Sequence, residues 1–159
     1  GLTPADVEIS PVSLTNVLES LATGTVAAAM WAGGVPTPSA IPRPGYGPPA
    51  GIRLLDLSAE LTVLRQRYGP LYEPVAVPAG MYGTRTETAT IGVPSVLLTT
   101  AATPDAAVTA VVDALVDDAS QLIPKGTVGV QFLDTQTLIQ VYGLTLHPAA
   151  AAAYRRHHG

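Results

Sequence analysis

Apolar residues recur at two different spacings along this chain, and each spacing predicts a different element. Repeats of three or four residues, opened by a hydroxyl or carboxylate side chain and closed by glycine or proline, predict helices. The predicted helices are Leu14–Ala22, a short one at Pro38–Ile41, Ala59–Tyr68, Pro104–Ile123, a shorter one from Asp134 to Tyr142, and a terminal alanine-rich helix that ends near Arg156.

Short apolar or alternating runs between turn residues predict strands. The predicted strands are Val7–Ser10, Val26–Trp31, Ile52–Leu57, Tyr72–Val77, Thr90–Val93 and Ser95–Thr100. Pro94 separates the last two and makes this region a bent or edge strand, because proline donates no ladder hydrogen bond. Helix Leu14–Ala22 followed at once by strand Val26–Trp31 forms an αβ unit, and we assign the chain to the α/β class.

The strand Val26–Trp31 runs into a turn with two glycines and a Pro-x-Pro sequence. The glycines let a ligand approach main-chain N–H groups that a Cβ would cover. The first proline suits the first turn of a helix, whose N-terminus favours negative charge. In open α/β sheets the carboxyl ends of strands hold ligands, although an ordinary turn without a ligand is the alternative here. The candidate ligand-binding residues of this turn are Trp31, Gly33, Gly34, Pro36 and Thr37.

A second turn-rich segment, Pro78–Thr84, carries a lone aromatic residue, Tyr82, and Arg85 follows it closely. Aromatic rings beside exposed main-chain amides suit a small polar ligand, because the rings cover its apolar body while N–H groups take its carboxylate. Arg85 is the candidate cation for that carboxylate. The alternatives are core packing for Trp31 and a plain surface cation for Arg85. Tyr46 lies in the long Pro/Gly loop that separates the two segments.

Composition excludes several classes of function. The 159 residues are 47% hydrophobic and carry a net charge of −4, and Arg155-Arg156 is the single basic cluster. Nucleic acid is therefore not an expected partner, because its binding needs a patch of cations that faces phosphates. The chain has no cysteine, which excludes disulfides, thiolate metal sites and cysteine nucleophiles and fits an extracytoplasmic protein. No apolar run is long enough to span a membrane, and the start at Gly1 suggests a mature or truncated chain without a signal peptide.

Catalytic motifs are missing from the sequence. It has no Gly-x-Ser-x-Gly, His-Glu-x-x-His or Walker sequence, and no pair of residues placed for acid–base work. We expect His147 to cap or pack at a helix N-terminus, and His157 and His158 to lie at a fraying end. Asp117 and Asp118 are adjacent and belong to a solvated helix face. The expectation is a protein that is not an enzyme, with no catalytic residue, no metal site and no cofactor.

The order of motifs resembles the C-terminal half of TAXI-family solute receptors, the substrate-binding subunits of a branch of the TRAP transporters. The opening Gly1–Val7 is similar to the segment that follows the mid-chain helix of that family. The small-residue run Gly24–Ala29 followed by Gly33–Ile41 is similar to its "Gly-Gly-x-Pro-x-Pro-x-Ile" signature. Tyr72–Gly83 resembles its "x-Ile-Pro-Ala-Gly-x-Tyr" segment, and Leu146–Ala150 resembles its terminal Leu-His-Pro-Gly-Ala.

The resemblance implies a periplasmic-binding-protein type II-like lobe with a mixed sheet flanked by helices. Residues 1–90 would form part of the second-lobe core, and residues 91–159 a return segment with a long helix and C-terminal helices. It implies a periplasmic or extracytoplasmic receptor that binds a small carboxylate, such as glutamate or a dicarboxylate, between two lobes and docks on a membrane permease. A sensor or interaction domain without transport is the alternative.

Such a half-receptor would leave strand edges and helix faces uncovered. We therefore expect a homodimer or an exchange of segments with a second copy.

Overall fold

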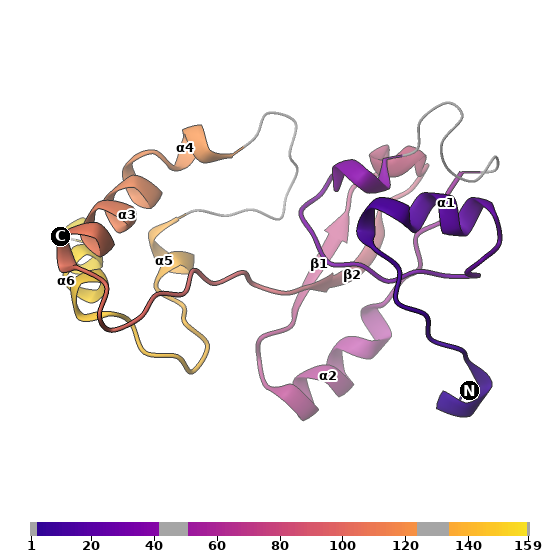
Figure 1. Ribbon diagram of the computed structural model, residues 1–159, viewed down its shortest axis with the longest axis horizontal. Helices are drawn as coiled ribbons and strands as arrows, with labels where there is room; N and C mark the ends of the chain where they lie inside the picture. The colour runs from indigo at the N-terminus through magenta and orange to yellow at the C-terminus, as the bar shows by residue number, and fades with distance from the viewer. Residues whose placement is uncertain (1–2, 42–50, 124–133, 159) are drawn as a thin grey trace.

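The computed structural model describes residues 3–41, 51–123 and 134–158. Short helices dominate these residues, and one two-stranded sheet lies among them (Figure 1). In chain order the elements are η1 (Pro4–Asp6), η2 (Leu14–Asn16), α1 (Val17–Ala22), η3 (Pro38–Ala40), η4 (Ser58–Glu60), α2 (Leu61–Tyr68), β1 (Glu73–Val77), η5 (Met81–Gly83), β2 (Thr88–Gly92), α3 (Asp105–Asp117), α4 (Ala119–Leu122), α5 (Thr135–Leu138) and α6 (Pro148–His157), where η marks a 3-10 helix.

Strands β1 and β2 pair antiparallel, with Val75 opposite Thr90 at the centre of the ladder. They confirm the strand predicted at Tyr72–Val77 and most of the one at Thr90–Val93. The mixed sheet expected from the resemblance is not present in the described residues, where the sheet has only these two strands. The small sheet among helices remains compatible with the α/β class.

Four predicted strands are wrong. The structure forms no strand at Val7–Ser10, Val26–Trp31, Ile52–Leu57 or Ser95–Thr100. A strand exists only through hydrogen bonds to a neighbour, and these segments lack a ladder within the described part of the chain. A single backbone bond, from Leu57 N–H to Ala89 O at 3.2 Å, ties the third segment to β2. Alanine also favours strands weakly, and Ala27 and Ala28 are exposed rather than buried.

The helices follow the local signals more closely. Helix α1 with η2, and α2 with η4, fill the ranges predicted for them. Gly69 ends α2 with φ of 89°, a value that glycine adopts without strain. Asp134 caps α5 by accepting from the N–H groups of Gln136 and Thr137. Residues 124–126, whose proline and glycine end the helix predicted over Pro104–Ile123, and Tyr46 with the loop around it lie outside the described residues.

The long helix predicted over Pro104–Ile123 is broken. Helix α3 ends at Asp117, and α4 starts at Ala119. Asp118 stands between them with φ of −104° and ψ of 14°, outside the helical range, and its carboxylate accepts from the side-chain amide of Gln121 at 2.9 Å. Aspartate competes for local hydrogen bonds in this way and therefore favours helix ends over helix interiors.

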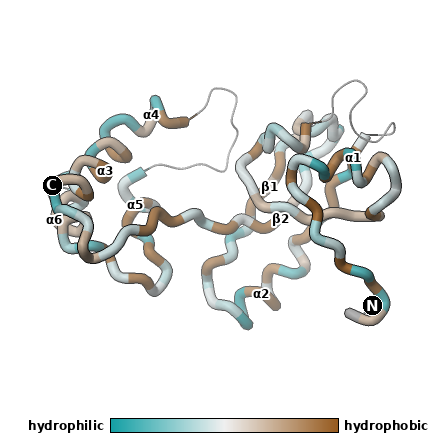
Figure 2. The backbone as a smooth tube through the Cα atoms, in the orientation of Figure 1, coloured by the Kyte–Doolittle hydropathy of each residue, from teal (hydrophilic) through white to brown (hydrophobic). Residues whose placement is uncertain are grey.

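Buried side chains form two separate cores. The first core consists of Val35, Ala40, Val77 and Tyr82, with Trp31, Ile52, Leu54 and Met81 packed against it. The second core consists of Val108, Val112, Ala149, Ala150, Ala153 and Tyr154, from α3 and α6. Figure 1 shows α3 to α6 on one side of the molecule, and β1, β2, α1 and α2 on the other. The extended segment after β2 joins the two parts, and Figure 2 shows apolar residues along it.

Candidate functional site

The double-glycine turn folds back against the turn that follows β1. The hydroxyl of Tyr82 accepts from the N–H of Thr37 at 2.7 Å, and the Trp31 indole N–H donates to Thr37 Oγ1 at 3.3 Å. The Trp31 and Tyr82 rings meet edge to face, with 6.1 Å between their centroids. Thr37 and Tyr82 are buried, whereas Trp31 is half-buried. The structure therefore brings together two segments that lie 45 residues apart in the sequence.

Gly33 and Gly34 pack against Thr37 of this cluster, and their lack of a Cβ also leaves their main-chain N–H groups uncovered. Thr37 Oγ1 donates to the Gly34 carbonyl at 2.7 Å. A Cβ placed on Gly33 would lie 3.0 Å from Thr37 Oγ1, which is closer than ordinary packing allows. Within the described residues, neither the Gly33 nor the Gly34 N–H has a hydrogen-bond acceptor. These two amides are therefore available to an anion.

Pro36 does not start a helix, which corrects the prediction made for it. Helix η3 begins at Pro38, and the Val35–Pro36 peptide bond that precedes it is cis. With only three residues in a 3-10 turn, η3 has too few aligned peptide dipoles to attract an anion. The attraction expected of a helix N-terminus is therefore absent, and any anion at this turn would rely on single N–H groups.

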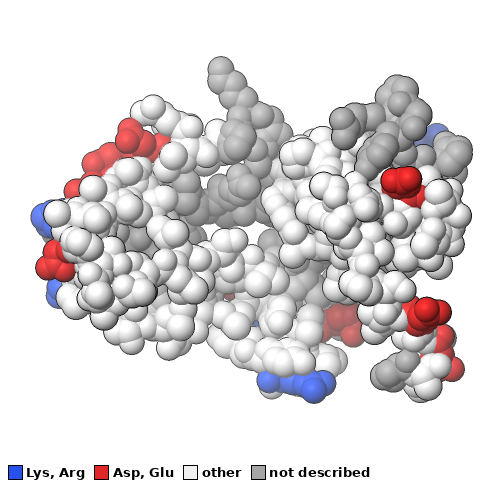
Figure 3. Space-filling view, viewed as in Figure 1, with Lys and Arg blue, Asp and Glu red and all other residues white. Residues whose placement is uncertain are grey.

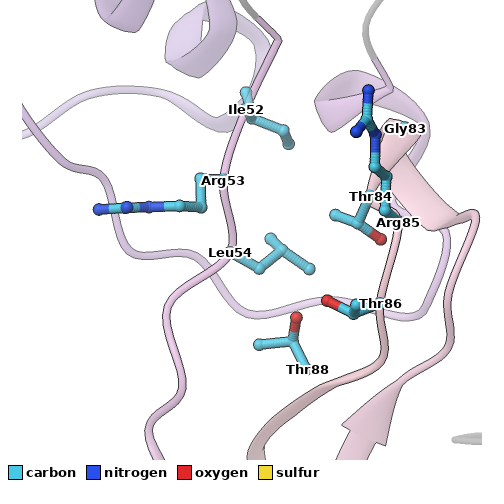
Figure 4. A pocket seen from close by; sticks show the side chains of 8 residues that line it. All are labelled: Ile52, Arg53, Leu54, Gly83, Thr84, Arg85, Thr86 and Thr88. Carbon is cyan, nitrogen blue, oxygen red and sulfur yellow. The ribbon is translucent and has the colours of Figure 1, made fainter.

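Next to this cluster lies an open depression of about 240 Å³. Two extended segments face each other across it, as Figure 4 shows. One side presents the apolar Ile52 and Leu54, which also pack against the first core. The other side carries a run of hydroxyl residues beside one cation, namely Thr84, Arg85, Thr86 and Thr88.

The polar groups of the depression differ in what they already bind. Thr84 Oγ1 donates to the Met81 carbonyl at 2.8 Å, which holds the turn closed. Thr86, Thr88 and Arg85 make no side-chain hydrogen bond or ion pair to any residue that the structure describes. In Figure 4 the Thr86 and Thr88 hydroxyls point toward the middle of the depression, whereas the Arg85 side chain runs along its rim past Gly83 and Arg53 extends away from it. Two hydroxyls at the middle and one guanidinium at the rim therefore have no partner among the described residues.

Sequence reasoning found Arg85 and missed the threonines around it. Thr84, Thr86 and Thr88 alternate along the chain, and this period of two places side chains on one face of an extended segment. That alternation was the available signal. The alternation could not reveal that the threonines face Ile52 and Leu54 across the depression, because these two residues were assigned to a separate strand.

A polar cluster at the second core was also missed. His157, expected at a fraying end, lies in α6 and places Nε2 at 2.9 Å from Asp113 Oδ1 of α3. Arg156 reaches the same carboxylate at 3.2 Å. His147 caps α6 by accepting from the Ala149 N–H through Nδ1, as its position predicted. The described residues contain no cluster of three or more metal-ligating side chains.

The described residues thus include an open depression lined by threonine hydroxyls and arginines, next to a buried aromatic cluster. Comparison with protein families shows that residues 1–157 match the model of the NMT1-like family, a family of the periplasmic-binding type. The chain therefore belongs to the NMT1-like family. Its members are solute-binding proteins, generally without enzymatic activity and typically extracytoplasmic.

Comparisons with curated proteins and with solved structures gave no significant match. Among the described residues, no helix is long and apolar enough to cross a bilayer.

Proposed function

We propose that this protein is the solute-binding receptor of a TRAP-type uptake system of the TAXI branch. It works in the periplasm or an equivalent extracytoplasmic space and binds a small carboxylate, either an amino acid such as glutamate or a dicarboxylate. Membership of a solute-binding family supports the receptor class. The observation that supports the choice of ligand is Arg85, which has no ion pair to any described residue and lines the same depression as the Thr86 and Thr88 hydroxyls and the apolar Ile52 and Leu54.

In this proposal the carboxylate binds the Arg85 guanidinium, which presents two parallel donors to it. The hydroxyls of Thr86 and Thr88 take polar groups further along the ligand, and Leu54 covers its carbon chain. The amides of Gly33 and Gly34 serve a second carboxylate or an amino acid backbone. Trp31, Pro36, Thr37 and Tyr82 then form the wall that fixes these amides. A membrane permease is the partner that receives the loaded receptor.

Isothermal titration calorimetry of the 159-residue chain with glutamate, a four-carbon dicarboxylate and glutamine tests the proposal. Arg85→Gln should weaken carboxylate binding by about 10- to 100-fold, because a charged hydrogen bond contributes about 1.5–3 kcal/mol. Arg53→Gln is the matched control, because this neighbour extends away from the depression and should leave the affinity unchanged. Equal losses in both variants would show only long-range attraction to positive charge.

Transport needs a separate test. Membrane vesicles that contain a TRAP-type permease from the same organism should accumulate the bound carboxylate only when the receptor is added. Binding without any stimulation of uptake would remove the transport proposal and leave a carboxylate-binding domain.

A further inference from the structure

The segment that joins the two cores exposes an unusual amount of apolar surface. Val93, Val96, Leu97 and Leu98 are 60%, 43%, 74% and 71% exposed. Residues 88–104 include no charged residue, so the segment itself carries no charge that would repel a neighbouring chain. Soluble proteins protect exposed strand-like segments with charges, proline or covering elements. Pro94 alone provides such protection within residues 88–103, and it precedes the exposed run at residues 95–100.

The backbone of this segment is also free to pair. Ser95–Thr99 donates and accepts no backbone hydrogen bond within the described part of the chain. The segment follows β2 directly, and Figure 1 shows it running from the sheet to the helical part. On the face shown in Figure 3, charged side chains gather toward the ends and the lower edge, with uncharged surface between them. Both the backbone and the surroundings of this segment therefore admit another strand.

Among the residues that the structure describes, none covers these side chains, which stay exposed. Another exposed extended stretch of the described chain is near the N-terminus, where Ile9 is 87% exposed. Figure 1 shows that this stretch runs from the N-terminus to α1, on the other side of the β1–β2 sheet from residues 95–100. The Asp6 and Glu8 carboxylates also flank Ile9, whereas the joining segment is uncharged. The partner that fits is an equally uncharged strand, and a second copy of this chain supplies one.

We propose that residues 95–100 pair antiparallel with the same residues of a second copy, around a twofold axis at Leu97. Opposed residues in an antiparallel pair share one face of the ladder. With Leu97 opposite Leu97 of the second copy, Val96 lies opposite Leu98 and Ser95 lies opposite Thr99. Apolar side chains then meet apolar ones and hydroxyls meet hydroxyls. A shift by one residue would place Val96 opposite Thr99 and lose this match. A twofold pairing closes on itself and yields a dimer rather than a fibre.

The absence of cysteine makes this register directly testable. In the twofold pairing, Leu97→Cys places two thiols opposite each other, and directly opposed residues in antiparallel strands stand at a Cα separation that a disulfide accepts. Under mild oxidation, Leu97→Cys should form a covalent dimer at least about 100-fold faster than Met30→Cys, because pairing raises the effective thiol concentration from micromolar to millimolar. Met30 is 87% exposed and lies outside the segment, so it is the matched control.

Sedimentation velocity supplies the second measurement. The chain should sediment as a dimer at micromolar concentration, and Leu97→Lys should sediment as a monomer, because it places like charges opposite each other. Met30→Lys should stay dimeric. The proposal is overturned if the unaltered chain is a monomer, if Leu97→Lys stays dimeric, or if Leu97→Cys cross-links no faster than Met30→Cys. None of these outcomes depends on carboxylate binding, because the segment lies outside the depression.

Discussion

Thr37 holds the candidate site together at the scale of single residues. Its N–H binds the Tyr82 hydroxyl, and its own hydroxyl stands between the Trp31 indole and the Gly34 carbonyl. The Thr37 carbonyl accepts from the Ala40 N–H at 3.0 Å, so every polar atom of this buried residue has a partner. The same bonds use the polar atoms of Trp31 and Tyr82, so those two side chains wall the site more readily than they bind a ligand.

The hydroxyl of Tyr82 should therefore contribute measurably to stability. Tyr82→Phe keeps the ring but leaves the buried Thr37 N–H without an acceptor, which costs about 1–3 kcal/mol. Urea denaturation followed by tryptophan fluorescence measures this loss, because Trp31 belongs to the same cluster. Tyr68→Phe is the control, since Tyr68 is 51% exposed and should change the free energy of unfolding little. Equal stability of the Tyr82 variant and the original chain would contradict the role given to this bond.

The residues of this cluster could be selected from the sequence, but their roles could not. Paired glycines before Pro-x-Pro and a lone tyrosine between glycines are local signals, and the structure brings both segments together. Whether an aromatic faces a ligand or closes a hydrogen-bond network depends on a contact across 45 residues, which no local pattern records. Thr86 and Thr88 were missed for the same reason, because their value depends on the segment opposite.

At the scale of elements, helices were predictable and strands largely were not. A helix satisfies its backbone within itself, so caps such as Asp134 and stops such as Gly69 are enough to locate it. A strand forms only by pairing with a second strand, and local sequence patterns do not identify which segment that second strand is. Among the described residues only β1 and β2 form strands, and they pair with each other across the ten-residue connection at 78–87.

Close packing in the β1–β2 ladder gives a prediction at Gly92. A Cβ on this residue would lie 2.8 Å from Val75 Cγ1 and 3.3 Å from Val75 Cγ2, and a branched side chain in a strand has little freedom to move away. Gly92→Ala should destabilise the protein by about 1–3 kcal/mol, as overpacked sites do. Adding Val75→Ala should recover most of this loss in a double-mutant cycle measured by thermal unfolding. Simple additivity of the two changes would show that the two side chains do not clash.

Helix α6 gives a prediction about alkaline pH. Burial raises the pKa of Tyr154, because the phenolate is poorly solvated in the second core. The pKa of Tyr154 is about 10 in the unfolded chain and higher in the folded one. The buried neutral phenol therefore contributes fully to the free energy of unfolding below about pH 10, and this contribution is lost as the pH rises through the folded pKa. Helical circular dichroism in urea between about pH 8 and 11 should show a smaller loss of stability for Tyr154→Phe than for the original chain. Equal losses of stability with rising pH in Tyr154→Phe and in the original chain would contradict this prediction.

At the scale of the whole molecule, the two cores share no buried residue. The first is built from residues 35–82, and the second from residues 108–154. The segment between them is extended and largely exposed, and it offers little packing through which one core could sense the other. This arrangement predicts two units that unfold with their own free energies rather than one cooperative transition.

Hydrogen exchange of Val112→Ala tests this independence. Val112 is 4% exposed in the second core, and the loss of two methyl-sized groups should cost about 1.5 kcal/mol or somewhat more with the cavity left behind. The amides of α3 and α6 should lose protection by about tenfold or more, while those of β1 and β2 keep theirs. Val111→Ala is the matched control, because Val111 is its neighbour on the same helix but is 43% exposed. An equal loss across both parts would show one cooperative unit, and its coupling would have to pass through residues 93–104.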